Sequence, residues 1–561
     1  MAEKLTAQQL QAVTDRGGNL LVSAAAGSGK TKVLVDRLMS YLTDPVNPAN
    51  LDNFLIITYT KAAAAELRGK IASKLSERIA EDPTNRHLQQ QMQRLYLTKI
   101  STVHAFCTDI LREYAYQLEL SSDFRVADEN EVVELQDRAL QQVLDQAYEK
   151  ADEDPDFCRF IDSQGFGRDD SMIPEIILKV YHTANCHLDP AGWLDWCVSV
   201  SADTEVEDAA QTVWGAYLLA DLQSYVALQI EAMNRCVQRA TATVGMDKVV
   251  LLLNETVDHL VALRNCKTWD DVLRHGDIDY GRLTIPKTVT DIGLAEQIKS
   301  IRDACKKGIA KKLRRFTDSS DQILSDLNEC LPTVRGLVAL TKEFGNLYTA
   351  MKRKRRVLDF GDLEHKMLDL LLGKKRSGPT IIADEIGQRF REVMVDEYQD
   401  SNAVQDAIFT ALTYKRKNCF MVGDVKQSIY QFRLADPGIF LEKYHRFIPA
   451  DDATIGQDRK VILSKNFRSA GSVIRAVNDV FSACMSPEVG GLYYGQEEQL
   501  CEGIEHLPSN EREVELLAID VQEDTYAEEA AFVADKISIF WTVRTWSAKG
   551  IPSAQLKRRI S

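Results

Sequence analysis

An α/β fold with a parallel sheet is predicted by three features of the sequence. Short apolar runs typical of buried strands occur at residues 19–23 and 54–58, and each is followed by a helical spacing of apolar residues. From about residue 107 to about residue 350 the helical spacing dominates, with few strand-like runs. Strand-like runs then return at residues 391–397, 418–424 and 460–466. This order predicts a parallel sheet with helices on both faces, interrupted by a large all-helical insertion.

The composition is typical of a folded protein with several domains. A chain of 561 residues is too long for one hydrophobic core, and 45% hydrophobic and 27% charged residues are ordinary globular values. No apolar run is long enough to cross a bilayer, and the start (MAEKLTAQQLQAV) lacks the layout of a signal peptide. The 11 cysteines include no CxxC pair, which argues against a zinc site and a disulfide framework. We therefore expect a cytoplasmic protein without a membrane segment.

The net charge of −15 does not exclude a nucleic-acid partner, because binding depends on where the basic residues lie. Two local concentrations of basic residues are present, and each is either a solvated helix face or a binding surface. They are Lys306, Lys307, Lys311, Lys312, Arg314 and Arg315, and residues 352–356 (KRKRR). Composition alone does not decide between the two interpretations.

A phosphate-binding loop is predicted directly after the first strand. Its residues are Ala24, Ala25, Ala26, Gly27, Ser28, Gly29, Lys30 and Thr31, with Ala24 where the usual pattern has glycine. Gly27 and Gly29 allow the backbone N–H groups to point inward at phosphate oxygens. Lys30 would supply a charge to the β- and γ-phosphates, and Thr31 a hydroxyl to Mg²⁺. The start of a helix at Lys30 adds its positive dipole end.

Two adjacent acids, Asp396 and Glu397, follow the apolar run at residues 393–395. Asp396 is placed to hold Mg²⁺, and Glu397 to orient and deprotonate an attacking water molecule. Adjacent acids at a strand end are also found in solvated turns. The phosphate-binding loop earlier in the chain favours a catalytic pair and therefore hydrolysis of ATP with Mg²⁺ as cofactor.

Six segments together resemble the motifs of superfamily 1A helicases, the UvrD/Rep/PcrA/RecB group. They are residues 5–9 (LTAQQ), 58–63 (TYTKAA), 101–107 (STVHAFC), 396–400 (DEYQD), 422–433 (VGDVKQSIYQFR) and 463–469 (LSKNFRS). The resemblance implies a RecA-like P-loop sheet (domain 1A), a helical domain 1B and an incomplete second RecA-like domain 2A. The expected bounds are 1–106 and 351–445 for domain 1A, 107–350 for 1B, 446–540 for 2A and 541–561 for an atypical tail.

The resemblance also implies roles for individual residues. Gln9 would contact the adenine edge and Phe467 the nucleotide, while Gln427 and Arg468 would contact the γ-phosphate. With Lys30, Asp396 and Glu397, Gln427 and Arg468 make the expected catalytic set. The expected DNA contacts are Thr58, Tyr59, Thr102, His104, Tyr430 and Phe432. Aromatic rings offer flat faces on which bases of a single strand stack, although large apolar side chains are more often buried in a core.

Within the group, the sequence is most similar to the AddA branch. The similarity lies in residues 124–129, 357–363 and 433–440 and in the length of the helical insertion. It implies an ATP-dependent 3′→5′ DNA helicase subunit of an AddAB-type helicase/exonuclease. Such a protein would act on single-stranded DNA and duplex ends in double-strand break repair and homologous recombination, as a heterodimer with an AddB-like subunit.

The family's later motifs are not found in the sequence. No match to motif V, motif VI or an acidic nuclease cluster follows residues 463–469, and residues 541–561 do not resemble the family. We therefore expect a truncated or frameshifted reading without the nuclease domain. Two alternatives stay open: a non-catalytic fragment that binds ATP and DNA, or a subunit that only scaffolds a partner nuclease.

Overall fold

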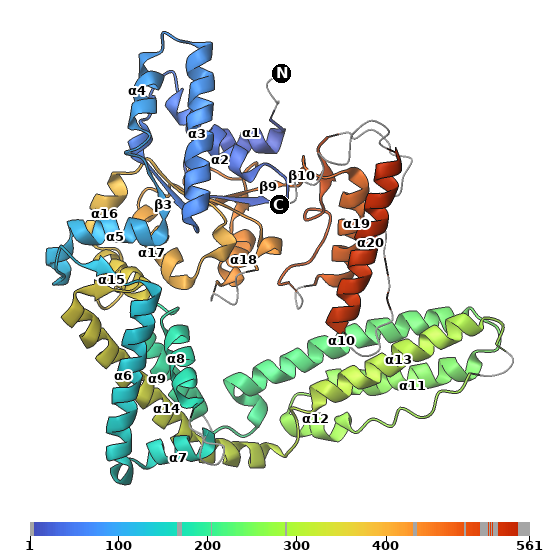
Figure 1. Ribbon diagram of the computed structural model, residues 1–561. Helices are drawn as coiled ribbons and strands as arrows, with labels where there is room; N and C mark the ends of the chain where they lie inside the picture. Colours follow the sequence, from blue (N-terminus) through green and yellow to red (C-terminus); the bar gives the residue numbers. More distant parts are fainter. Residues whose placement is uncertain are drawn as a thin grey trace.

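A seven-stranded parallel sheet forms the centre of the computed structural model (Figure 1). The structure describes residues 5–164, 171–202, 205–285, 289–429, 435–486, 490–504, 514, 517, 519 and 525–547. The strand order is β3-β2-β6-β7-β1-β9-β8. The bounds are β1 Leu20–Ala24, β2 Phe54–Thr58, β3 Lys99–Thr102, β6 Glu392–Val395, β7 Cys419–Gly423, β8 Ile448–Pro449 and β9 Arg459–Leu463. The predicted α/β class with a parallel sheet is confirmed.

Helices cover both faces of the sheet, which explains why its strands read as continuous apolar runs. Leu21 packs into one hydrophobic core, whereas Leu20 and Val22 pack into the other, because successive side chains of a strand point to opposite faces. One core includes α1 (Ala7–Thr14), α2 (Lys30–Leu42), α3 (Lys61–Glu81) and α4 (Arg86–Arg94). The other includes α5 (Val103–Glu113), α15 (Phe360–Leu372), α16 (Ile381–Gln388), α17 (Ala403–Thr413) and α18 (Pro437–Arg446).

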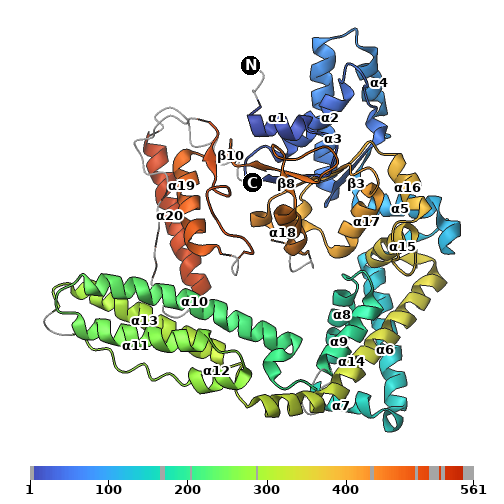
Figure 2. The same ribbon diagram turned by 180° about the vertical axis from the view of Figure 1, so that it is seen from behind.

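The helical insertion leaves and rejoins the sheet region through a short parallel pair, β4 (Arg125–Val126) and β5 (Val357–Leu358). Its helices are α6 (Glu129–Glu149), α7 (Pro155–Gln164), α8 (Ile173–Ala184), α9 (Pro190–Ser201), α10 (Val213–Thr241), α11 (Asp247–Arg264), α12 (Trp269–Gly276), α13 (Ile292–Leu313) and α14 (Ser320–Arg355). These helices enclose two main hydrophobic cores, one with α6–α8 and one with α10–α13. The 36-residue helix α14 runs through both groups (Figures 1 and 2).

Short 3-10 helices complete the chain's regular structure: η1 (Leu51–Asn53), η2 (Ala115–Leu118), η3 (Ala151–Glu153), η4 (Ala209–Gln211), η5 (Tyr398–Asp400) and η6 (Val425–Gln427). After β9 come β10 (Lys465–Asn466), α19 (Gly471–Cys484), β11 (Cys501–Glu502) and α20 (Thr525–Ser547). Helices α19 and α20 lie side by side in both views (Figures 1 and 2). Of the expected tail at 541–561, residues 548–561 lie outside the described ranges. No described helix combines the length and the apolar character needed to span a bilayer.

Two contacts lie near the expected domain boundaries at residues 107 and 446. Helix α5 packs its apolar face, including Phe106 and Ile110, into the core of the sheet. Strand β9 pairs with β1 in the first sheet, Val22 opposite Val461. In both cases a long-range apolar contact, which local spacing does not reveal, decides where the segment belongs.

The two basic concentrations have different environments. Lys312 and Arg315 share Asp221 at 2.7 and 3.4 Å, while Lys306, Lys307, Lys311 and Arg314 are exposed. In the second concentration Lys352 is buried between Asp359 (2.7 Å) and Asp362 (2.6 Å). The run at 352–356 is therefore neither a uniformly solvated face nor an open basic patch, because its first residue is part of the interior.

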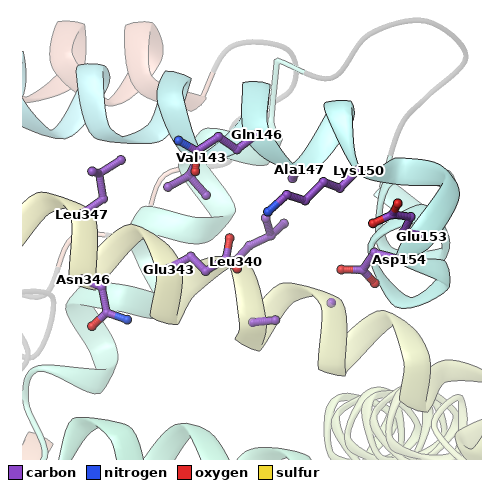
Figure 3. A pocket seen from close by; sticks show the side chains of 12 residues that line it. Val143, Gln146, Ala147, Lys150, Glu153, Asp154, Leu340, Glu343, Asn346 and Leu347 are labelled. Carbon is purple, nitrogen blue, oxygen red and sulfur yellow. The ribbon is translucent and has the colours of Figure 1, made fainter.

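A groove of about 610 Å³ runs between α6 and α14 (Figure 3). Lys150, Glu153 and Glu343 are among its lining residues. Gly336 of α14 lies opposite α7 at one end, where a Cβ atom would come within 2.4 Å of the backbone oxygen of Asp156. The groove therefore ends where two helix backbones approach closely.

Candidate active site

The phosphate-binding loop connects β1 to α2 at the carboxyl edge of the sheet. Gly27 and Gly29 have φ angles of 69° and 86°, which side chains rarely adopt. A Cβ atom on Gly27 would also lie 2.8 Å from Oδ1 of Asn466. Asn466 Nδ2 donates to Ala26 O at 2.9 Å, so the loop is held by the chain that follows β9.

Three loops meet at this edge because β6, β7 and β1 are neighbours in the sheet. Lys30, at the start of α2, donates from Nζ to Glu397 Oε2 at 2.7 Å. Gln399 Nε2 donates to the same oxygen at 2.9 Å, and Gln399 Oε1 accepts the backbone N–H of Asp424 at 3.0 Å. Gln427 Nε2 donates to Asp424 Oδ2 at 2.7 Å. A chain of hydrogen bonds therefore links the first loop to the third.

Gln399 is a central residue to which the sequence pattern gave no role. A Cβ atom on Gly423 would lie 2.4 Å from Gln399 Oε1, so only glycine allows this close approach at the end of β7. The sequence does show a glycine at the end of an apolar run, Gly423, followed by Asp424. Their partner Gln399, however, follows a different strand, β6. Spacing along one segment does not identify such a contact.

Burial and repulsion from a neighbouring carboxylate disfavour the ionised forms of Asp396 and Asp400 in the loop after β6. Burial and the neighbouring Glu397 raise the pKa of Asp396 to about 6, and the same two causes raise the pKa of Asp400 to about 6. Oδ1 of Asp400 is buried without a hydrogen-bond partner among the described residues. An additional cation would relieve this excess of negative charge.

These observations fit a Mg²⁺ ion held by Thr31 and Asp396. Both offer oxygen atoms, the donors that this ion prefers. Within the described ranges no three His, Cys, Asp or Glu side chains are grouped as a metal site.

A small cleft beside the loop is the expected place for the nucleotide base. Gln9 and Phe467 line it together with Thr6, Gln8, Ser28, Leu463, Ser464 and Lys465. The Gln9 side chain is buried, donates from Nε2 to Ser28 O at 2.9 Å and accepts from Thr6 N at 3.0 Å. Phe467 N donates to Gly27 O at 2.9 Å. The adenine contact of Gln9 stays a prediction, because both polar ends of its amide have partners within the protein.

A larger cleft of about 1600 Å³ lies between the sheet region and the helical insertion. Tyr59, Thr102 and His104 line it, and their contacts with DNA stay a prediction. Tyr59 is half-buried and its hydroxyl contacts Ser401 Oγ at 2.5 Å. Tyr430 and Phe432 lie outside the described residues.

Thr58 does not fit the expected DNA contact. Its side chain is only 2% exposed at the end of β2, and its hydroxyl donates to Thr60 O at 3.2 Å. A neighbouring residue of the same segment, Lys61, lines the cleft instead. All five residues of β2 are buried because helices cover both faces of the sheet, so a motif that begins at the end of this strand mixes buried and open positions.

Phe360 is a candidate that the sequence pattern did not single out. It is 55% exposed, lines the larger cleft and stacks on His104 with ring centroids 4.2 Å apart and planes at 15°. His104 Nε2 lies 3.1 Å from Glu364 Oε1, which fixes the histidine ring from behind. The sequence feature that could have identified Phe360 is its place as the first residue of a helix capped by Asp359. A large apolar side chain at this position does not pack into the core.

Arg468 lies in the exposed part of the chain after β10. Its backbone N–H donates to Asn466 Oδ1 at 2.7 Å. Within the described ranges its side chain has no hydrogen-bond or ion-pair partner that would hold it away from the phosphate-binding loop. The contact of Arg468 with a γ-phosphate stays a prediction.

Comparisons with known proteins agree with this arrangement of loops. Residues 5–448 match the model of the UvrD/REP helicase N-terminal domain.

The chain is also similar to bacterial proteins that are named as the A subunit of an ATP-dependent helicase/nuclease. That of Pelotomaculum thermopropionicum is 37% identical over 515 residues, covering 90% of this chain and 40% of the relative. That of Ruminiclostridium cellulolyticum is 34% identical over 555 residues, covering 95% and 44%, and that of Clostridium novyi 32% over 568 residues, covering 98% and 45%. The chain thus spans less than half the length of these curated relatives.

Proposed function

The chain belongs to the UvrD/REP helicase family, and from this premise we propose that it is an ATP-hydrolysing DNA motor of the AddA type. One observation supports the proposal most directly. The loops after β1, β6 and β7 meet so closely that Lys30 and Glu397 are in contact at 2.7 Å. A lysine suited to bind phosphate and a carboxylate suited to activate water thus lie side by side at the end of the phosphate-binding loop.

The residues act in a defined order in this proposal. Lys30 is bound to Glu397 before the nucleotide arrives. The phosphates of ATP then attract Lys30, which frees Glu397 to accept the proton of the attacking water. Gln399 keeps the Glu397 carboxylate oriented through the contact at 2.9 Å. Mg²⁺, when bound at Thr31 and Asp396, supplies positive charge that neutralises the phosphate oxygens.

We assign the parts of the chain as follows. The seven-stranded sheet and its covering helices are domain 1A, the RecA-like ATPase unit. Residues 127–356 are domain 1B, and domain 2A begins after β9, at residue 464. The assignment rests on the sheet pairing of β9 with β1 and on the β4–β5 pair.

The larger cleft is the proposed path of a DNA single strand. Bases would stack on Tyr59 and Phe360, an interaction worth roughly 1–3 kcal/mol per base and independent of sequence. Lys61, Arg112 and Lys342 line the same cleft and would contact phosphates. By family resemblance, the direction of movement is 3′→5′ from duplex ends, with an AddB-like partner, in cytoplasmic double-strand break repair and homologous recombination.

The test is steady-state ATP hydrolysis with and without single-stranded DNA. We expect DNA-stimulated turnover that is lost in Glu397→Gln and kept in Glu66→Gln, a control acid on the exposed face of α3. ATP binding without turnover in the unmodified chain would contradict a motor. That outcome would favour the alternative of an ATP- and DNA-binding fragment.

A further inference from the structure

A buried ion pair joins the loop after β7 to residues 490–504. Lys426 Nζ lies 2.9 Å from Glu498 Oε2 and 3.0 Å from Asp424 Oδ1, and the Lys426 and Glu498 side chains are 9% and 5% exposed. The Tyr444 hydroxyl donates to the other oxygen of Glu498. Glu498 therefore has one partner on each carboxylate oxygen and almost no contact with water.

On one side, this pair is connected to the candidate active site. Lys426 precedes Gln427, and both side chains contact the carboxylate of Asp424. Asp424 is in turn joined to Glu397 through the two contacts of Gln399. A displacement of Lys426 would therefore act on the carboxylate that orients Gln427.

On the other side, Glu498 is part of the body that carries Arg468. Asn478 of α19 donates to Leu500 O at 2.9 Å and accepts from Tyr494 at 2.7 Å, which fixes residues 490–504 on α19. Strand β11 pairs with β10, with Glu502 opposite Asn466. Arg468 lies two residues after β10, so Glu498 and Arg468 are carried by the same pair of strands.

The pair resists separation. Although burial opposes its charge, Asp424 and Glu498 raise the pKa of Lys426 above its ordinary value, so the ammonium stays charged. Separating Lys426 from Glu498 would leave the buried Glu498 carboxylate without its cationic partner, which is strongly unfavourable. The contact therefore holds the loop after β7 firmly against residues 490–504.

We propose that the Lys426–Glu498 pair is a positioning contact, which couples the approach of Arg468 to the nucleotide with the setting of Gln427. The inference rests on the proposed function, because it assigns the pair a role in the same ATPase cycle. Neither side chain is placed against ATP. The pair sets the relative position of Gln427 and Arg468, the two residues that are proposed to contact ATP.

The first experiment compares steady-state ATP hydrolysis of Glu498→Gln, Lys426→Met and the double variant. We expect each single variant to lower kcat about tenfold or more, the size of typical coupling free energies, with KM for ATP changed less than about twofold. The double variant should be no slower than the slower single variant, because one contact can be lost only once. Glu497→Gln is the matched control, since Glu497 is the adjacent exposed acid and loses the same charge.

Equal kcat in Glu498→Gln and Glu497→Gln would overturn the inference. So would rate losses in Lys426→Met and Glu498→Gln that multiply in the double variant. Unchanged ATP affinity of Glu498→Gln verifies that the variant is folded, because nucleotide binding needs the intact loop between β1 and α2.

A second experiment does not depend on turnover. Hydrogen exchange is measured in residues 425–429 and 490–504, with and without a non-hydrolysable ATP analogue. In the unmodified chain we expect the analogue to protect both segments, and in Glu498→Gln only residues 425–429. Protection of both segments in Glu498→Gln would overturn the inference while the proposed function stands. Failure of the unmodified chain to bind the analogue would overturn the proposed function itself.

Discussion

Helix α2 is joined to strand β6 and its loop by two ion pairs, one at the first residue of the helix and one near its middle. At the carboxyl edge of the sheet, Lys30 contacts Glu397 with side chains 14% and 42% exposed. Two turns further along the helix, Arg37 contacts Glu392 with side chains 1% and 4% exposed. The two pairs have the same charges and the same supporting elements, and differ mainly in their access to solvent.

The difference in exposure indicates that the two ion pairs have different roles, one in catalysis and one in stabilising the fold. Every nitrogen of the Arg37 guanidinium has a partner: Nε and Nη2 donate to the two oxygens of Glu392 at 2.8 and 2.5 Å, and Nη1 donates to Ala12 O and Asp15 O at 2.7 Å each. Because the Arg37–Glu392 pair is buried and fully hydrogen-bonded, neither water nor a ligand competes for its partners. Lys30 and Glu397 face a space that ligands reach, so phosphate and water compete for them. The buried pair fixes the helix, and the open pair is free to react.

The largest effect is expected from Glu397→Gln. Removing a general base costs typically about 10²–10⁴ in rate, so ATP turnover should fall by that factor while the thermal unfolding midpoint stays within a few degrees. Turnover is measured by phosphate release with saturating single-stranded DNA. A Glu397→Gln variant with a lowered unfolding midpoint but normal ATP turnover would show that the Lys30–Glu397 pair supports the fold and not catalysis.

Next comes the buried pair, tested with Glu392→Gln. Leaving Arg37 charged and unpaired in the interior should cost about 3–5 kcal/mol of stability. Denaturant unfolding measures the loss, and the KM for ATP of the remaining folded protein should be nearly unchanged. The exposed pair of Glu66 with Lys70 provides the control, because Glu66→Gln should leave the unfolding curve in place. Equal curves for the two variants would contradict the comparison.

A smaller effect is expected along the same open edge, at Phe360. Loss of one stacking ring should weaken single-stranded DNA binding by roughly 1–3 kcal/mol, which is about 5- to 150-fold. Anisotropy of a labelled oligothymidylate at fixed salt measures the affinity of Phe360→Ala, and ATP affinity should not change. Tyr116→Ala removes an exposed aromatic that does not line the cleft, and should have no effect. Equal affinities in both variants would exclude Phe360 as a binding surface.

The smallest effect concerns a buried lysine with two carboxylates, Lys352. Burial and the neighbouring Asp359 raise the pKa of Asp362 to about 6. As the pH falls through 6, the folded protein takes up this proton, while the unfolded chain does so only near about 4. The stability contributed by this group therefore rises as the pH falls from about 7 to about 4. At pH 7.5, Asp362→Asn should stabilise the protein by on the order of 1–2 kcal/mol. The gain should fall to about half near pH 5 and vanish only below about pH 4.

The neighbouring acid serves as the matched control for that measurement. Although burial opposes ionisation, Lys352 holds the pKa of Asp359 below its ordinary value, so Asp359→Asn should destabilise the protein at neutral pH. Thermal unfolding of both variants at pH 7.5 and pH 5 gives the two differences. Changes of the same sign in both variants would contradict the assigned roles of the two acids.

The sheet and the meeting of the three loops were predictable from the chain alone. Apolar runs marked β1, β2, β6 and β7, and parallel strands bring their carboxyl ends to one edge, where Lys30, Asp396 and Gln427 were expected. The resemblance to the AddA branch is confirmed by the similarity to the bacterial helicase/nuclease proteins. Local sequence could not show that Thr58 is buried, because the neighbouring strand β6 is far away in the chain. It also could not show that Lys352 is internal, because that depends on how the chain turns after α14 to bring Asp359 and Asp362 against it.

The sequence by itself determined the local structures that need only neighbouring residues. These are the turn at Gly27, the helix that starts at Lys30 and the acids that follow β6, all set by backbone conformation and apolar spacing. The tertiary structure alone decided which residues share a partner: Gln399 between Glu397 and Asp424, Phe360 on His104, and Glu498 on Lys426. The physical reason is that burial and ion pairing depend on contacts across strands and helices, and the energies of these contacts exceed any local preference.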